Sequence, residues 1–371
     1  MRLVHISDTH LGFSAYSKIE PKEGVNRREQ DIYDAFQQAI DKTIDLRPDV
    51  AVHAGDLFDN VRPQNRAIDF ALRQLLRLSE AGIETVLISG NHSTPRMRET
   101  GSIFRIFEHL KHIHPVFEPG CKRLVLGDLT VHAIPHSTNP PLTQVLGEAA
   151  PSKETSRNVL LLHAGILGSD TYKMDEFNEQ TIPADALSDG WDYVALGHYH
   201  EHKRVRPMTF YSGSTERLGF GEVGQKKGIV EVDLESGKLA FHELKIRDMI
   251  DLPAVDAAGL TSSEILKEAR SATSGTAIDD RIARITISNV SAEAYRSLDS
   301  SAIRRLGASA LHFELKVDVV EADKPGLSSS DMQIGVLADE YRKYVATLDL
   351  PDAKKSRLIA MGTPYLEKVQ E

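Results

Sequence analysis

Cysteine is nearly absent from this sequence, since Cys121 is the single one among 371 residues. One thiol cannot form an internal disulfide framework, which excludes the disulfide-rich secreted classes and fits a reducing cytosol. No motif around Cys121 would make its thiol reactive, so we expect a surface or half-buried side chain.

Long hydrophobic runs are also missing. No stretch approaches the roughly 20 apolar residues that a membrane helix requires. The first residues read directly as a strand, which leaves no room for a signal peptide. We therefore expect a cytoplasmic protein.

The chain has no excess of positive charge, because its formal net charge at pH 7 is -10. This balance argues against coating nucleic acid by bulk attraction. Bound divalent cations would reverse the sign of the charge inside a site, so catalysis on a phosphodiester stays open. The length allows two or three domains with substantial cores.

Five short apolar runs end directly in side chains that can bind a metal. The runs are predicted strands at Leu3–Ser7, Val50–Ala54, Thr85–Ser89, Val159–Leu162 and Tyr193–Leu196. The side chains that follow these runs, in order, are Asp8 and His10, Asp56, Asn91 and His92, His163, and His198 and His200. Open α/β sheets place ligands beyond the carboxyl ends of their strands, so we expect one shared rim. Glycines before several of these side chains permit the sharp turns such a rim needs.

The donor types indicate the class of metal. Carboxylate, amide and imidazole ligands suit borderline metals such as Mn²⁺, Fe or Zn²⁺ rather than Ca²⁺ or thiolate sites. A single Asp-x-His is common by chance, but five such motifs in order, each after a strand, are specific.

The remaining pattern predicts an α/β fold, a mixed two-sheet β-sandwich flanked by helices. Helices are expected with Ile32, Phe36, Ile40 and Ile44 on one face, and with Ile68, Leu72, Leu75 and Leu76 on another. From residue 124 onward a hairpin and antiparallel strands, including 208–211, are expected. Residues 249–323 resemble a small α+β cap domain with a helix over 292–306, after a core that spans residues 1–248.

The end of the chain reads as a tail. Residues 324–330 look like a linker. Within 331–371, Ile334, Leu337, Tyr341, Tyr344 and Leu348 follow a heptad spacing, and a second helix carries Leu358 and Ile359. Such helices either pack back onto their own domain or dock onto a partner's helices.

These motifs resemble the calcineurin-like metallophosphoesterases over residues 1 to about 245. Within that superfamily, Ser7–Gly12, Ala54–Asp59 and Tyr211–Arg217 are similar to the SbcD branch of DNA double-strand-break repair nucleases, the prokaryotic counterparts of Mre-eleven. The layout of the cap domain and the helical tail is also similar to that branch.

The resemblance implies two divalent metal ions bridged by Asp56, with Mn²⁺ as the expected metal. The first ion would be held by Asp8, His10 and His200, and the second by Asn91, His163 and His198. Paired metals activate a water that attacks the phosphate and neutralise the charge that develops there. His92 would be the catalytic residue that positions the phosphate or protonates the leaving oxygen.

Two positions depart from the superfamily pattern. Ser93 stands where Asp commonly follows Gly-Asn-His, which leaves the orientation of His92 open. Asp59 stands where Mre-eleven proteins often have His, and it either supports His92 or caps the turn as an exposed carboxylate.

The other histidines have ordinary interpretations. His5, His53 and His132 lie within apolar strands and are expected to be core imidazoles. His136 and His202 lie near the rim and are candidates for supporting the ligands. The cluster of His109, His112 and His114 is expected to be solvated.

Five basic residues are candidates for DNA-backbone contacts, with a solvated surface as the alternative: Arg96, Arg98, Lys203, Arg204 and Arg206.

The resulting hypothesis is a Mn²⁺-dependent DNA exonuclease and endonuclease that acts beside an SbcC-type (Rad-fifty-like) SMC ATPase. The ATPase would bind the tail helices, and a homodimer would form through helices near 68–78 and 103–107. The alternatives are a phosphodiesterase on nucleotides or small esters and a non-catalytic scaffold on the same core.

Overall fold

The computed structural model describes residues 1–16, 18–19, 24–95, 101–167, 180–320, 341, 344–345 and 352–367. The chain divides into two compact units, Met1–Asp318 and Val319–Glu371.

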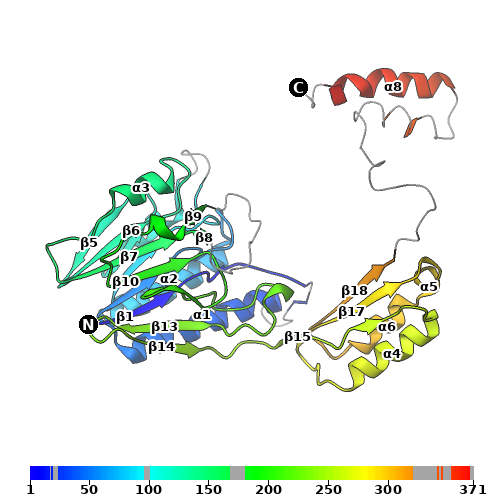
Figure 1. Cartoon of the computed structure of the whole chain (residues 1–371), viewed down its shortest axis with the longest axis horizontal. Coiled ribbons are helices and arrows are strands. Elements are labelled where there is room, and N and C mark those ends of the chain that lie inside the picture. The colour runs from blue at the N-terminus through cyan, green and yellow to red at the C-terminus, as the bar shows by residue number, and fades with distance from the viewer. Residues whose placement is uncertain are drawn as a thin grey trace. The chain divides into compact units, whose positions relative to one another are not determined.

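Two mixed six-stranded sheets face each other in the described part of the first unit (Figure 1). The first sheet has the order β14 (Lys238–Glu243), β13 (Gly228–Asp233), β1 (Arg2–Ile6), β2 (Val50–His53), β3 (Glu84–Ile88), β4 (Ile113–Val116). The second has the order β11 (Lys203–Arg206), β12 (Thr209–Tyr211), β10 (Tyr193–Gly197), β7 (Arg157–His163), β6 (Leu129–Ile134), β5 (Lys122–Leu126). The predicted two-sheet sandwich is confirmed.

Strand direction brings the rim together. In the first sheet β1, β2, β3 and β4 are parallel neighbours, as the strand and helix alternation predicts. In the second sheet β6, β7, β10 and β12 are parallel. The antiparallel strand expected at 208–211 is confirmed by the pairing of β12 with β11, and β12 also pairs in parallel with β10. The carboxyl ends of five ligand-bearing strands can thus meet at one edge of the sandwich.

Apolar side chains from both sheets fill the space between them. Val52 and Val86 of the first sheet belong to the same buried cluster as Val131 and Leu161 of the second. The central strands β1, β2, β3, β7 and β10 are buried almost throughout, which explains why they read as continuous apolar runs.

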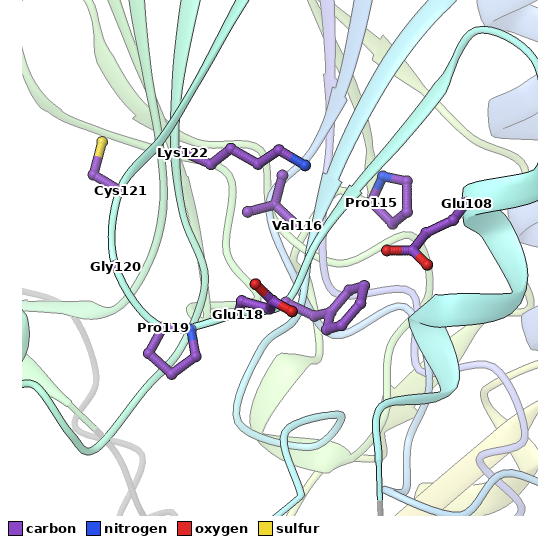
Figure 2. A pocket seen from close by; sticks show the side chains of 9 residues that line it. Glu108, Pro115, Val116, Glu118, Pro119, Gly120, Cys121 and Lys122 are labelled. Carbon is purple, nitrogen blue, oxygen red and sulfur yellow. The ribbon is translucent and has the colours of Figure 1, made fainter.

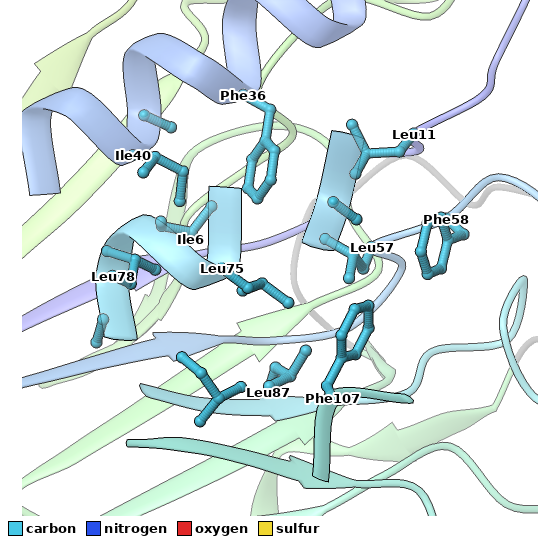
Figure 3. Packing of buried hydrophobic residues seen from close by; sticks show 14 of the residues in the cluster. Ile6, Leu11, Phe36, Ile40, Leu57, Phe58, Leu75, Leu78, Leu87 and Phe107 are labelled. Carbon is cyan, nitrogen blue, oxygen red and sulfur yellow. The ribbon is translucent and has the colours of Figure 1, made fainter. Parts of the chain in front are cut away.

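Helices cover the outer face of the first sheet (Figure 3). These are α1 (Arg27–Leu46), α2 (Asn65–Glu80) and the 3₁₀ helix η2 (Ile103–His109). Asn26 caps α1, because its side chain accepts hydrogen bonds from the backbone of Arg28 and Glu29. The predicted face of α1 is confirmed, since Ile32, Phe36 and Ile40 are buried.

The predicted face of α2 is confirmed for Leu75, with Leu72 partly buried against the same cluster, and is wrong for Leu76. The buried residues are Ala67, Ala71, Leu75 and Leu78, whereas Leu76 is 41% exposed. Small alanines allow α2 to lie close to α1 and the sheet, and Leu76 is left exposed at the margin.

The outer face of the second sheet carries shorter elements. These are α3 (Leu142–Glu148), the pair β8 (Gly165–Leu167) and β9 (Thr181–Pro183), and the 3₁₀ helix η3 (Ala184–Ala186). Leu142, Val145 and Leu146 of α3 pack in one buried cluster with Leu160 and Leu162 of β7.

A small α+β unit follows β14. Its elements are β15 (Met249–Asp251), β16 (Val255–Asp256), α4 (Ser262–Ser274), β17 (Ile282–Val290), α5 (Ala292–Ser297), α6 (Ser300–Leu306) and β18 (His312–Val319). The single helix expected over 292–306 is wrong, because Asp299 interrupts it and accepts a hydrogen bond from the backbone N of Ala302 at 2.8 Å. Asp299 thereby begins a second helix.

The second compact unit contains α8 (Asp352–Glu367), which confirms a second helix in the tail. Tyr341 donates a hydrogen bond to the carbonyl oxygen of Leu358 at 2.9 Å. Ile334, Leu337, Leu348 and the linker 324–330 lie outside the described residues. Within the described ranges, no helix is both long enough and apolar enough to cross a membrane.

A cavity of about 310 Å³ lies between β4 and β5 (Figure 2). Glu108, Glu118, Cys121 and Lys122 are among its lining residues. None of the strand-end motifs contributes to it. Cys121 is half-buried as expected, and burial raises the pKa of its thiol, which keeps it protonated and unreactive.

Candidate metal centre

The predicted metal-binding side chains lie together at the carboxyl ends of five strands. Asp8 and His10 follow β1, Asp56 follows β2 and Asn91 follows β3 in the first sheet. In the second sheet, His163 ends β7, and His198 and His200 follow β10. Because the two sheets face each other, residues almost two hundred positions apart meet at one edge.

One group of donors consists of Asp8, His10 and His200, whose ligand atoms all lie within 4.8 Å of one another. All three side chains are buried. The Nε2 atoms of His10 and His200 are 3.1 Å apart. Two imidazole nitrogens at this distance require either a shared proton or a shared cation.

A second group consists of Asp8, Asp56 and His163, again within 4.8 Å of one another. His163 Nε2 lies 3.1 Å from Asp56 Oδ2 and 2.8 Å from Asn91 Oδ1. The other ring nitrogen, Nδ1, donates to the carbonyl oxygen of Ala54 at 2.8 Å. This bond fixes the ring so that Nε2 faces the carboxylate and the amide.

His198 joins this region through both its backbone and its ring. Its backbone N donates to both carboxylate oxygens of Asp8, at 3.0 and 3.1 Å. Its ring lies edge-on to that of His163, with centroids 5.4 Å apart. Asp8 is the carboxylate common to both donor groups, whereas the resemblance assigns the bridge to Asp56.

The backbone is strained at four of these residues. Asp8, His10, Asp56 and His198 have positive φ angles of 51°, 50°, 49° and 104°. Such conformations are costly for side chains other than glycine and persist where the surroundings enforce them. The backbone N of Asp8 donates to Gly55 O at 3.0 Å, and that of His10 donates to Asp56 O at 3.0 Å.

Glycines make room for the donors. A Cβ on Gly90 would lie 2.2 Å from Asp56 Oδ1, and one on Gly55 would lie 2.2 Å from His163 Nδ1. A Cβ on Gly197 would lie 2.0 Å from the carbonyl oxygen of Ala54. The donors therefore occupy space that any side chain at these positions would fill.

The electrostatics of the site fit a divalent cation. Burial would lower the pKa of His163, but the carboxylates of Asp56 and Asp8 raise it to about 9. Burial would raise the pKa of Asp56, but the imidazoles of His163, His10 and His92 hold it well below its usual value. Burial raises the pKa of Asp8. Buried carboxylates need positive charge beside them, and carboxylate, amide and imidazole donors suit a borderline divalent metal. The residues present thus fit the pair of metals that the resemblance implies.

His92 lies beside this centre and is held by a backbone carbonyl. Its Nδ1 donates to the carbonyl oxygen of Asp59 at 2.9 Å. Its ring lies edge-on to that of His10, with centroids 4.8 Å apart. Its own backbone N donates to Asp56 Oδ1 at 3.0 Å. The ring orientation that the sequence leaves open is therefore supported by main-chain geometry.

Ser93 and the Asp59 side chain have other contacts. Ser93 is buried, and its hydroxyl donates to the carbonyl oxygen of Phe58 at 3.3 Å. Asp59 Oδ1 lies 3.3 Å from His10 Nδ1, with the Asp59 side chain 22% exposed. The carboxylate of Asp59 thus faces a donor residue, and its carbonyl supports His92.

Three supporting residues went unrecognised in the sequence. Ser7 donates to Asp8 Oδ2 at 2.6 Å, and Ser212 lies 2.7 Å from the Ser7 hydroxyl. Glu222 accepts a hydrogen bond from His200 Nδ1 at 2.8 Å. Ser212 stands in the Tyr211–Arg217 stretch, but nothing in the sequence pattern marks Glu222.

The remaining histidines divide into core and edge positions. His5 contacts the Tyr193 hydroxyl at 3.0 Å and His53 contacts the Thr9 hydroxyl at 2.7 Å, and burial lowers the pKa of each to about 3. His132 lies 3.2 Å from Asn158 Oδ1. These three are core imidazoles, as predicted.

The two candidate supporting histidines are His202 and His136. His202 Nδ1 donates to Tyr211 O at 3.0 Å, and its ring stacks on Phe241 with centroids 4.3 Å apart. His136 is buried, and its backbone N donates to Ser89 O at 2.9 Å.

The expectation of a solvated cluster at 109–114 is wrong for two of its members. His112 Nδ1 lies 2.7 Å from one oxygen of Glu84, and His114 Nε2 lies 2.6 Å from the other. Only tertiary pairing of β3 with β4 brings Glu84 to them. His109 is exposed.

The candidate DNA-contacting residues have different outcomes. Arg96 and Arg98 lie outside the described residues. Lys203 and Arg204 lie on β11, an edge strand, where Arg204 is exposed. Arg206 donates to the carbonyl oxygens of Leu187 and Ser188 at 2.8 and 3.0 Å, so it has a structural role.

Comparison with known proteins places this geometry in a family. Residues 1–223 match the calcineurin-like phosphoesterase family. Curated relatives named DNA double-strand break repair protein Mre11 are similar to the chain. The protein from Sulfurisphaera tokodaii is 35% identical over 205 residues, which cover 54% of this chain and 49% of the relative. The protein from Sulfolobus acidocaldarius is 33% identical over 264 residues, which cover 68% of this chain and 66% of the relative.

The chain thus spans about half to two thirds of the length of these relatives. The family match covers more than half of the chain. It includes every strand end that carries a predicted metal donor. The chain therefore belongs to the calcineurin-like phosphoesterase family.

Proposed function

We propose that this chain is a metal-dependent DNA nuclease that acts in double-strand-break repair. The observation that carries the proposal is the pair of buried donor groups that share Asp8. The similarity to proteins named for DNA double-strand break repair supports the choice of substrate.

In this proposal, Asp8, His10 and His200 hold one divalent cation, and Asp56, Asn91, His163 and His198 complete the second site. Mn²⁺ suits this donor set. When bound, such a pair supplies Lewis acidity that activates water and stabilises charge on the phosphate. The buried position of the donors excludes bulk water from the ligands and strengthens their electrostatic interactions.

His92 is proposed to act on the phosphodiester as a catalytic residue. Its Nδ1 proton is committed to the carbonyl oxygen of Asp59, so proton exchange with a substrate runs through Nε2. His92 stands beside Asn91 and is half-buried. It can therefore donate a proton to the leaving 3′-oxygen without serving as a ligand.

DNA and partner contacts extend the proposal. Lys203 and Arg204, together with Arg96 and Arg98, would contact the phosphate backbone. The tail would bind an SbcC-type SMC ATPase through its helices. In the tail, Leu358 and Met361 are 39% and 60% exposed, and such apolar exposure on a helix suits helical docking.

A homodimer is proposed through α2 and η2. Leu76 is exposed, and Ile68 and Leu72 are half-buried, so part of the apolar surface of α2 remains accessible beside the core that the helix covers. Replacing Leu76 with Arg should convert a dimer to a monomer in light scattering, and an unchanged mass would place the contact elsewhere.

The decisive experiment combines metal titration with two substrates. Isothermal titration should give two Mn²⁺ per chain, and linear duplex DNA should be cleaved only with Mn²⁺. Asp8→Asn should abolish both the binding of Mn²⁺ and the cleavage of DNA, since Asp8 belongs to both donor groups. Cleavage of bis-p-nitrophenyl phosphate without cleavage of DNA would favour a phosphodiesterase of small esters. Absence of bound metal would favour a non-catalytic scaffold.

A further inference from the structure

His200 is held in place by the ion pair of Glu222 and Lys227, which lie outside the strand-end motifs. Glu222 Oε1 accepts a hydrogen bond from His200 Nδ1 at 2.8 Å. Lys227 Nζ donates to the carbonyl oxygen of His200 at 2.8 Å and lies 2.6 Å from Glu222 Oε2. The ring and the backbone of His200 are therefore held by the same two charged groups.

This contact decides which nitrogen of His200 faces the donor group. Because Nδ1 donates to Glu222, Nε2 is the atom that faces His10 Nε2 at 3.1 Å. A carboxylate behind a metal-binding imidazole fixes the ring and makes its free nitrogen a stronger ligand. The side chain of Glu222 is 12% exposed and that of Lys227 is 0% exposed, so water cannot replace either contact easily.

The turn that carries Glu222 rests on the small α+β unit. The 3₁₀ helix η4 (Phe220–Glu222) is followed by Val223. Phe220 and Val223 pack against a buried cluster formed by Met249, Ile282 and Leu311. The guanidinium of Arg284 on β17 lies 4.5 Å from the centroid of the Phe220 ring. Arg284 is itself held by Asp251 at 2.7 Å.

We propose that residues 219–223 couple the small α+β unit to the metal centre, with Glu222 as the positioning residue for His200. The inference rests on the proposed metal-binding function. Movement of the small unit would withdraw Phe220 and, with it, the carboxylate behind His200. The affinity for the cation held by Asp8, His10 and His200 would fall first. The other site would be less affected, because its ligand His163 is held by the carbonyl of Ala54 instead of by Glu222.

Mn²⁺ titration into the full chain tests the first half of this proposal. Glu222→Ala should weaken one of the two Mn²⁺ sites by about 10–100-fold, the range known for outer partners of metal ligands, and the other much less. Glu222→Gln keeps an acceptor for Nδ1 and should weaken it less. Glu231→Ala is the matched control, because Glu231 forms a pair of the same 2.8 Å length with His242 on β13 and β14. Thermal unfolding in EDTA separates loss of positioning from loss of fold.

The second half of the proposal concerns the contacts that hold residues 219–223 against the small α+β unit. Phe220→Ala and Arg284→Ala should weaken the same Mn²⁺ site by about tenfold. Ile303→Ala is the control, because Ile303 is buried in α6 within the core of the small unit and belongs to a different cluster. Equal weakening by Ile303→Ala would overturn the coupling and indicate general loosening of the unit.

The outcomes separate this inference from the proposed function. Two Mn²⁺ sites of wild-type affinity in Glu222→Ala would overturn the inference and leave the proposed metal centre intact. Failure of the wild-type chain to bind Mn²⁺ would overturn the proposed function itself.

Discussion

Replacing Gly90 with Ala would add a single methyl group to the proposed metal centre. Gly90 precedes Asn91 at the end of β3, and its φ lies outside the left-handed region, so alanine can adopt this backbone conformation. The effect of the substitution is therefore steric. A Cβ at this position would lie 2.2 Å from Asp56 Oδ1 and 2.7 Å from the Asp56 backbone N.

The size of the effect follows from these distances. To reach ordinary contact at 3.4 Å, the carboxylate of Asp56 must move by roughly 1 Å, whereas metal ligands tolerate about 0.2 Å. We expect Mn²⁺ affinity to fall by at least about 100-fold, since even outer partners of ligands change it by about 10–100-fold. The added methyl should also lower the free energy of unfolding by about 1–3 kcal/mol.

Isothermal titration with Mn²⁺ measures the affinity, and urea unfolding in EDTA measures the stability. Gly147→Ala is the matched control, because a Cβ there meets nothing within 4 Å. It should keep Mn²⁺ binding and stabilise α3 by up to about 1 kcal/mol, the usual gain for this change in a helix. If a folded Gly90→Ala chain bound two Mn²⁺ as tightly as wild type, Asp56 would not belong to the metal centre.

Three further predictions concern catalysis, pH and the tail. His92→Ala should bind Mn²⁺ and DNA normally but cleave DNA about 10²–10⁴-fold more slowly, and near wild-type cleavage in a gel assay would remove its catalytic role. The pKa of His163 is raised from 6.5 to about 9, so without metal its proton stabilises the fold below pH 6.5 and this stability is lost as pH rises through 9. A bound metal must displace that proton, so Mn²⁺ affinity should rise over the same window while the melting temperature in EDTA falls; a flat affinity would contradict the assigned ligand. Deleting residues 328–371 should leave Mn²⁺-dependent cleavage intact, because residues 1–318 form a compact unit of their own. The same deletion should abolish co-purification with an SMC ATPase, and retained co-purification would place the docking surface elsewhere.

Local sequence was sufficient where one strand alone sets the position of a donor. Asp8, Asp56 and Asn91 each follow a buried apolar run, and parallel strands place their carboxyl ends at the same edge whatever lies on their faces. The same reasoning predicted strands that end at His163 and before His198, and the structure shows that these strands, β7 and β10, are parallel neighbours. Strand order within a sheet was not needed for this conclusion.

Periodicity was less reliable for faces and helix ends. Ile68, Leu72 and Leu76 have the spacing of a buried stripe, but Ala67 and Ala71 are buried beside Leu75 and Leu78, and Leu76 is exposed. Close approach to α1 favours small side chains, and that approach is a property of the packed fold. Asp299 likewise ends one helix and begins another through a capping bond that composition alone does not reveal.

By itself, the sequence was sufficient to predict the two-sheet fold, the family resemblance and the side chains whose donor atoms meet at the strand ends, because each of these depends on short runs and their order. The tertiary structure decided how the donors are supported. Ser212 reaches Ser7 across 205 positions, and Glu222 reaches His200 from a separate turn. His92 is held by a carbonyl of the strand-end loop after β2 rather than by the acid that Ser93 replaces. Such contacts form between segments that are distant in the chain, so no local spacing records them.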